Sequence, residues 1–260
     1  MPSLSENFKD SFNYPIQDLK KFLIIGVILL FANLGGLFVS LNITNETLPF
    51  IFAIISFIIG LIFYGFIVAI IKESINDSNI LPDLDLAKNI VDGIKVFIME
   101  MVYGLITFII ILIVAIVSGS FTAALELINF TITNPGASLP TELIYNFIPG
   151  FIIVCIVLLI LAILFLMFTA IGFARLAKYD SLAQGLNIPE IIKDIGKIGW
   201  FNFIAWLIIA IIISWIIGII AGFIFVIPIA GWVINSLILF PFLYIFLGRS
   251  LGLVYTGINE

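Results

Sequence analysis

The chain has 260 residues, of which 63% are hydrophobic and only 10% are charged, and its formal net charge is −5. A soluble domain carries roughly 25% charged residues, so this composition excludes a water-soluble globular fold and makes the bilayer the solvent for most of the surface. The acidic balance argues against nucleic-acid binding, and the lack of histidine excludes Ser-His-Asp catalysis and His-ligated metal or haem sites.

The first 21 residues are polar and mix lysines with acidic side chains. The apolar run that follows has no small-x-small cleavage site, so it does not fit a cleavable signal peptide. We therefore expect this run, over residues 22–41, to remain in the protein as its first span.

Six apolar stretches are predicted to cross the bilayer, which takes about 20 residues in a helix. They are 22–41, 48–71, 96–117, 144–174, 201–226 and 232–247. The fourth is longer than one span needs, so Pro149-Gly150 is expected in a turn at its outer end. The last two are separated at Ile227-Pro228 and Gly231, because proline lacks a backbone donor and glycine permits a turn. A re-entrant pair that never reaches the far side is the alternative for these two.

All eleven Lys and Arg residues fall on one side of the predicted membrane. The three alternate gaps, 42–47, 118–143 and 226–231, contain none. Because Lys and Arg accumulate in cytoplasmic loops, we expect a multi-pass protein of a prokaryotic plasma membrane with both termini in the cytoplasm and an outer insertion at about 118–143. The side chains expected to anchor span ends at lipid headgroups are Lys20, Lys21, Lys72, Arg175, Lys178 and Arg249.

Three segments share one pattern, in which an Asn with a Pro close behind it begins a short amphipathic stretch that leads into a pair of spans. They begin at Asn13, Asn79 and Asn187. Asn is a good N-cap and Pro is tolerated in a first helical turn, so we expect amphipathic helices in the inner membrane interface. The predicted fold is all-α and polytopic, a single membrane domain over 1–260 built from three repeats of interfacial helix plus transmembrane hairpin. The repeat units cover about 13–72, 79–175 and 187–255.

Polar side chains within the apolar runs are the candidates for function. Glu100 is the one acidic residue inside a span, and an intramembrane ionisable group is a functional hypothesis by default. The alternative is that Glu100 reaches back to the interface near Lys95. Amides within spans usually hydrogen-bond between helices. The candidate intramembrane polar site is Glu100, Asn33, Asn202 and Asn235. We predict no catalytic residues, no metal ligands and no cofactor, and membrane lipids as partners.

Three Asn-x-Thr sequons agree with the predicted topology. Asn42, Asn45 and Asn129 all fall on the predicted outer side.

Sparse motifs run along nearly the whole chain. They are Tyr14-Pro15, Asp18, Gly26, Gly65, Leu81-Pro82, Gly93, Tyr103, Ala174-Arg175, Tyr179 and Gly248-Arg249. In this order they resemble the domain-of-unknown-function 4013 proteins, an uncharacterised family of prokaryotic, often archaeal, membrane proteins. The resemblance implies an all-helical membrane domain without an assigned activity, and it transfers no functional residues.

Three functions stay open. Repeated hairpins and Glu100 favour a transporter or permease-like protein, because transporter sites lie between repeats. Short inner loops and few buried polar clusters favour a non-transporting membrane scaffold or assembly partner. A membrane-embedded enzyme is third, weakened by the missing histidine and by the lack of convergent acids. Transport predicts a polar cavity lined by Glu100 or by the span asparagines.

Overall fold

The computed structural model describes residues 3–34 and 47–258, and every regular element among them is a helix. Five helical segments are long and apolar enough to cross a membrane, as expected for a multi-pass membrane protein. They are Phe50–Ile75, Leu86–Val117, Thr141–Tyr179, Trp200–Phe225 and Ala230–Tyr255. The first predicted span, 22–41, is described only up to residue 34, and the sequons at Asn42 and Asn45 lie outside the described residues.

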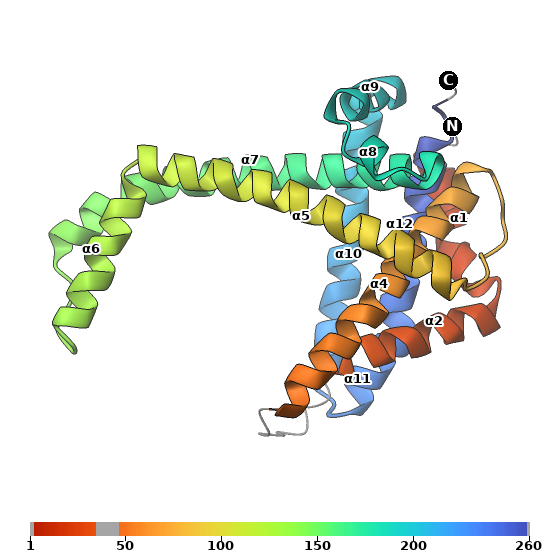
Figure 1. The fold of residues 1–260 in the computed structure, drawn as a ribbon, viewed down its shortest axis with the longest axis horizontal. Helices are drawn as coiled ribbons and strands as arrows, with labels where there is room; N and C mark the ends of the chain where they lie inside the picture. Colours follow the sequence, from red (N-terminus) through yellow and green to blue (C-terminus); the bar gives the residue numbers. More distant parts are fainter. Residues whose placement is uncertain (1–2, 35–46, 259–260) are drawn as a thin grey trace. The chain divides into compact units, whose positions relative to one another are not determined.

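Two compact units make up the chain (Figure 1). The first comprises Met1–Met99 and Ala170–Glu260, and the second comprises Glu100–Thr169. Helices α5 (Leu86–Val117) and α7 (Thr141–Tyr179) each contribute residues to both units. Each unit is described below by itself.

Helix α12 (Phe240–Tyr255) is at the centre of the first unit, where it contacts α1 (Leu4–Asn13), α2 (Leu19–Ala32) and α4 (Thr47–Ile75). Every residue from Gly248 to Tyr255 is buried. A Cβ atom on Gly252 would lie 2.3 Å from Cβ of Ser74 in α4, so glycine is required for this close approach. The core of the unit is therefore built around the last helix of the chain.

A second close contact joins α4 to the start of α5. A Cβ atom on Gly65 would lie 1.8 Å from the carbonyl oxygen of Asn89, and one on Gly93 would lie 1.9 Å from that of Leu61. Leu61 precedes Gly65 by four residues, and Asn89 precedes Gly93 by four. The two helices thus touch backbone to backbone in antiparallel directions, over one helical turn on each.

The break between α10 (Trp200–Phe225) and α11 (Ala230–Ile234) lies at the predicted Ile227-Pro228 turn. Ile229 adopts a left-handed conformation (φ +61°), which is strained for a β-branched residue. After α11 the helix widens into a single π-helical turn, η2 (Asn235–Leu239), and continues as α12.

The three predicted interfacial helices have different structures. In the first segment a 3-10 turn, η1 (Tyr14–Ile16), precedes α2, and the side chain that caps α2 is Asp18 rather than Asn13. For the segment that begins at Asn79, the prediction of a separate interfacial helix was wrong. Helix α5 runs unbroken from Leu86 to Val117, so its amphipathic start is continuous with the apolar span. The third segment is a separate helix, α9 (Ile188–Ile198), which follows the short α8 (Leu182–Gly185).

The second unit contains a helix, α6 (Ser120–Thr133), within the predicted outer insertion, and this helix carries the sequon at Asn129. The predicted turn at Pro149-Gly150 was wrong, because α7 continues through both residues. A proline is tolerated inside a membrane helix where neighbouring groups satisfy the freed carbonyl. Gly150 lies close to the chain that leads into α6, since a Cβ atom there would be 2.8 Å from the carbonyl oxygen of Ser118.

Candidate intramembrane pocket and inner polar network

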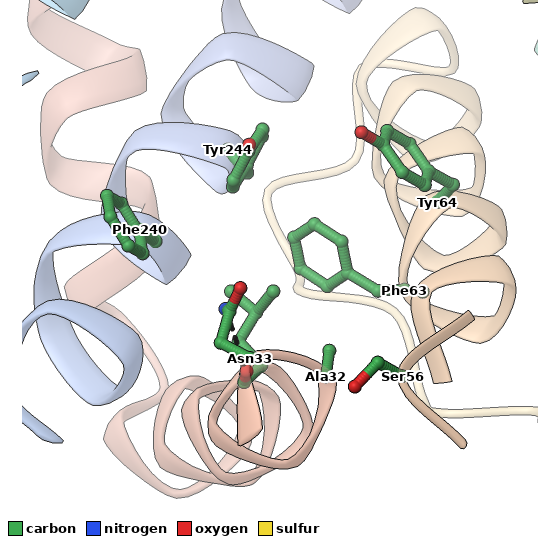
Figure 2. Close-up of a pocket in the computed structure, with 9 residues that line it drawn as sticks. Ala32, Asn33, Ser56, Phe63, Tyr64, Phe240 and Tyr244 are labelled. Atoms are coloured by element: carbon green, nitrogen blue, oxygen red, sulfur yellow. Dashed lines mark hydrogen bonds between the residues drawn. The ribbon is translucent and has the colours of Figure 1, made fainter. Parts of the chain in front are cut away.

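A pocket of about 380 Å³ lies between α2, α4 and α12 in the first unit (Figure 2). Its volume is near the lower end of the roughly 300–1,000 Å³ that small-molecule sites occupy. The lining residues are Leu29, Ala32 and Asn33 from the end of α2, Ser56, Gly60, Phe63 and Tyr64 from α4, and Phe240 and Tyr244 from α12.

Asn33 forms the polar end of the pocket on α2. It is the C-cap of that helix, and its Nδ2 donates a hydrogen bond to the carbonyl oxygen of Leu29 at 2.9 Å. The main-chain carbonyl oxygen of Asn33 accepts a hydrogen bond from Nε1 of Trp232 at 2.8 Å. The end of α2 is thereby fixed to α11.

Ser56 supplies a hydroxyl group from α4. Its oxygen is buried and has no hydrogen-bond partner within the described part of the chain. A buried polar group without a partner costs about 1–3 kcal/mol, so a polar group of a bound molecule would be stabilised here. Figure 2 shows this hydroxyl pointing from α4 towards Ala32.

An aromatic wall faces these polar groups. The rings of Phe63 and Tyr244 pack edge to face with their centroids 5.2 Å apart, a geometry that contributes about 0.5–1.5 kcal/mol beyond the area it buries. Phe63 projects from α4 towards α12, whose Phe240 and Tyr244 complete the wall (Figure 2). The pocket therefore combines an apolar wall with a polar rim.

The π-helical turn η2 ends immediately before Phe240, so it determines how the first turn of α12 enters the pocket. It also touches α2, since a Cβ atom on Gly26 would lie 2.4 Å from the carbonyl oxygen of Leu237. Single π-helical turns occur frequently at functional sites.

The four residues of the predicted polar site lie in different surroundings. Asn33 lines the pocket, whereas Asn202 is exposed near the start of α10. Asn235 is fully buried in η2, where its Nδ2 donates to the carbonyl oxygen of Ala221 at 2.9 Å. Its Oδ1 has no partner among the residues described. Glu100 is half-buried on α5 and belongs to the second unit.

A buried arginine organises the C-terminal half of α12. Arg249 is 1% exposed and donates from Nε to Oδ1 of Asp10 at 2.7 Å, from Nη1 to the carbonyl oxygen of Ser78 at 2.6 Å, and from Nη2 to the side chain of Asn79. Its guanidinium lies over the ring of Tyr14, 4.7 Å from the centroid. A planar guanidinium can satisfy this many partners in a fixed geometry, whereas an ammonium cannot.

Tyr14 completes this cluster. Its hydroxyl donates to the carbonyl oxygen of Ile80 at 2.9 Å, and burial raises the pKa of Tyr14 to about 12. Ser250, which follows Arg249 in the chain, donates from its hydroxyl to Oδ1 of Asn7 at 2.6 Å and accepts a hydrogen bond from Nε1 of Trp206 at 2.8 Å. Helices α1, α10 and α12 are thus joined by buried polar contacts.

A second buried arginine joins α7 to α8 and α9. Arg175 donates from Nε to the carbonyl oxygen of Gln184 at 3.0 Å and from Nη2 to its side chain at 2.6 Å, and its Nη1 pairs with Asp194. The same carboxylate accepts a hydrogen bond from the hydroxyl of Tyr255 at 2.6 Å. Asp194 is therefore buried within the protein.

Two lysines on helices pair with acidic residues in loops. Lys95 pairs with Asp92 at 2.8 Å and with Asp180, and this lysine lowers the pKa of the Asp180 carboxyl. Lys21 pairs with Asp83 at 2.8 Å and donates to the carbonyl oxygen of Leu81 at 2.6 Å. Asp83 is almost fully exposed, so solvent screens this pair.

The predicted headgroup anchors fall into two groups. Lys20 is exposed, and Lys21, Lys72 and Lys178 are half-buried. Arg175 and Arg249 are buried, and the partners observed for both are protein groups. Within the part of the chain that the structure describes, no group of three or more Asp, Glu or Cys side chains is placed to hold a metal ion.

The model of one protein family matches residues 48–226, and that family is described as "Protein of unknown function (DUF4013)". No curated protein and no solved structure was found to match. The matched segment includes the α4 side of the pocket and the cluster around Arg175, while α2 and α12 lie outside it.

Proposed function

This chain belongs to the DUF4013 family of proteins of unknown function, and we propose that it is a permease-like protein of a prokaryotic plasma membrane. The observation that carries this proposal is the pocket between the apolar helices α2, α4 and α12, which is lined in part by polar groups. Transport through a membrane needs such a site, since a solute that leaves water must find its hydrogen bonds within the protein.

We propose six spans with both termini in the cytoplasm. Asp10 pairs with Arg249 and Asn7 donates to the carbonyl oxygen of Ser250, so the first and last helices meet at one end of the first unit. Two ends on the same side require an even number of crossings. The five long apolar helices and the segment that begins with α2 add up to six. The one-sided Lys and Arg residues support the cytoplasmic assignment of that end.

We also propose the three repeat units, about 13–72, 79–175 and 187–255, each contributing one hairpin. In this division α2 and α4 belong to the first repeat, 13–72, while α12 belongs to the third repeat, 187–255. The pocket then lies between repeats, as substrate sites do in transporters built from internal repeats. Asn33 is assigned to this site, and Glu100, Asn202 and Asn235 are proposed as secondary polar positions. Lys20, Lys21, Lys72 and Lys178 are proposed to anchor span ends at headgroups.

The proposal is tested by solute uptake into proteoliposomes with a variant that fills the pocket. Gly60 lines the pocket, and a Cβ atom there would meet no heavy atom within 4 Å, so we expect Gly60→Leu to narrow the pocket without displacing the backbone. Gly218 on α10 is the matched control, since a Cβ atom there also meets nothing within 4 Å and Gly218 does not line the pocket.

The solutes are glycerol, urea, benzamide and benzoate. We expect at least one of them to enter faster than into empty liposomes, with the increase lost in Gly60→Leu and kept in Gly218→Leu. Equal rates in wild type, both variants and empty liposomes would overturn the permease proposal.

A membrane scaffold is the second candidate, and one observation favours it. In α5 and in α7, only 6% of the most apolar 18-residue stretch is buried within the protein, so both present apolar surface to lipid or to another protein. Cys155, the single cysteine of the chain, is exposed on α7 and takes a spin label without any mutation. Slow label motion in native membranes, with fast motion in pure lipid, would favour the scaffold.

A further inference from the structure

We infer that the pocket between α2, α4 and α12 takes a small uncharged molecule with an apolar body and a hydrogen-bonding group, and that it rejects ions. This inference rests on the proposed function and names the class of solute that the pocket accepts.

Charge is the first argument. Within residues 3–34 and 47–258, the nine residues that line the pocket include no Asp, Glu, Lys or Arg. An ion that enters an apolar segment of the membrane loses its hydration and needs a compensating charge at the site. The two buried arginines of the same unit, Arg175 and Arg249, are paired with Asp194 and Asp10 and line no part of the pocket. An ionised ligand would therefore be bound without compensation.

Hydrogen bonding is the second argument. The Ser56 hydroxyl is buried without a partner among the described residues, and a hydroxyl can both donate and accept. Asn33 contributes a carboxamide from the opposite helix. A neutral alcohol, amide or carbonyl group of a ligand would satisfy Ser56, whereas a purely apolar molecule would leave this hydroxyl unsatisfied.

The wall of the pocket supplies the third argument. Phe63, Phe240 and Tyr244 present aromatic surface on the side formed by α4 and α12 (Figure 2). Such a wall accommodates an apolar or aromatic body through offset or edge-to-face packing. A small polyol or a hydrated ion makes no use of this surface.

Gly60 provides the fourth argument. At Gly65, one turn further along α4, an added Cβ atom would collide with a backbone oxygen at 1.8 Å, so helix packing demands glycine there. At Gly60 no such demand exists, since an added Cβ atom meets no heavy atom within 4 Å. Because Gly60 lines the pocket, a larger side chain at this position is expected to reduce the pocket's volume.

The test uses benzamide and benzoate as probes, because the two share a ring and differ in charge. Binding of each radiolabelled compound is measured on purified protein in lipid nanodiscs, with wild type, Gly60→Leu and Gly218→Leu in parallel and empty nanodiscs subtracted. We expect saturable binding of benzamide to wild type and to Gly218→Leu, at least tenfold weaker binding to Gly60→Leu, and no saturable binding of benzoate.

Three results would overturn the inference: saturable binding of benzoate, benzamide binding that is equal in Gly60→Leu and wild type, and no saturable binding of benzamide at all. These results are separate from those of the uptake experiment. Saturable benzamide binding without uptake of any solute would leave the pocket assignment standing and remove the permease proposal. Uptake of benzoate that Gly60→Leu blocks would support the permease proposal and would overturn the inference that the pocket rejects ions.

Discussion

Arg249 in α12 and Asp10 in α1 are 239 residues apart in the chain, and a hydrogen bond of 2.7 Å joins Nε of the arginine to Oδ1 of the aspartate. The arginine is buried, whereas the aspartate is partly exposed. Through this pair and the bonds of Arg249 to Ser78 and Asn79, the first helix, the loop between α4 and α5 and the last helix share one cation. The contact places both ends of the described chain at one end of the first unit.

Replacing this arginine should destabilise the protein strongly. Arg249→Ala removes a buried side chain and leaves the partly exposed Asp10 without its partner, which should cost on the order of 2 kcal/mol. Arg249→Lys retains the charge but loses the planar fork, so its loss should be intermediate. Thermal unfolding in detergent measures both, with Lys20→Ala at an exposed position as the control, which should change stability by less than about 0.5 kcal/mol. A melting temperature unchanged in Arg249→Ala would contradict the structural role of the pair.

The crossing of α4 and α5 should not tolerate even a methyl group. Gly65→Ala places Cβ 1.8 Å from the carbonyl oxygen of Asn89, and the backbone must move to relieve the clash. Overpacking costs typically 1–3 kcal/mol, and a backbone clash at this distance should cost at least about 3. Gly104→Ala is the control, since a Cβ atom there meets nothing within 4 Å. The yield of monodisperse protein is the measurement, and equal yields for the two variants would refute the contact.

Alkaline pH should weaken the cluster around Tyr14. Burial raises the pKa of Tyr14 to about 12, above the value of about 10 in an unfolded chain. The folded state therefore favours the neutral phenol, so the associated stability is complete below pH 10 and is lost as pH rises from about 10 to 12. The loss should be on the order of 2 kcal/mol.

Tyr14→Phe isolates this effect, because phenylalanine does not ionise. The difference in melting temperature between wild type and Tyr14→Phe should be nearly constant below pH 10 and should shift in favour of the variant above it. All other ionisable groups are common to the two proteins, so their effects cancel in the difference. A difference that stays constant up to pH 12 would show that Tyr14 ionises as freely in the folded protein as in the unfolded chain.

Removing the hydroxyl of Ser56 should not destabilise the protein. Because this buried oxygen has no partner in the described structure, Ser56→Ala should leave stability unchanged or raise it by about 1 kcal/mol. Ser214 is the matched control on α10, where the hydroxyl donates to the carbonyl oxygen of Ala210 at 2.7 Å. Ser214→Ala should lower stability slightly. The measurement is the melting temperature of each variant in detergent, relative to wild type. A larger decrease in Ser56→Ala than in Ser214→Ala would show that the Ser56 hydroxyl has a hydrogen-bond partner.

The long apolar helices were predictable from sequence, because their length and hydropathy are local properties. The residues at which these helices begin and end were harder to predict. The amphipathic turns after Leu86 continue into the next apolar run without a breaking residue, so one helix forms where two were expected. Pro149 was interpreted as a turn by a rule that holds in water, whereas inside a membrane helix a proline is tolerated.

The pocket and the arginine clusters were not predictable, since each depends on contacts between distant segments. Ser56 and Tyr244 belong to different helices, and neither stands out within its own apolar run. Arg175 and Arg249 follow apolar runs, as an anchoring lysine does, and this local pattern does not distinguish an arginine at the headgroups from one buried against Asp194 or Asp10. Asn33 was found because an amide within an apolar run is conspicuous.

The central claim is that the pocket is a water-accessible solute site within the membrane. The direct measurement is cysteine modification of Gly60→Cys in a Cys155→Ser background, with methyl methanethiosulfonate applied to the protein in lipid vesicles with and without benzamide. The account predicts that Cys at this position reacts and that benzamide slows the reaction at least tenfold, while a cysteine at Gly218 reacts at the same rate with and without benzamide. A Gly60→Cys thiol that does not react, or that reacts equally fast in the presence of benzamide, would contradict it.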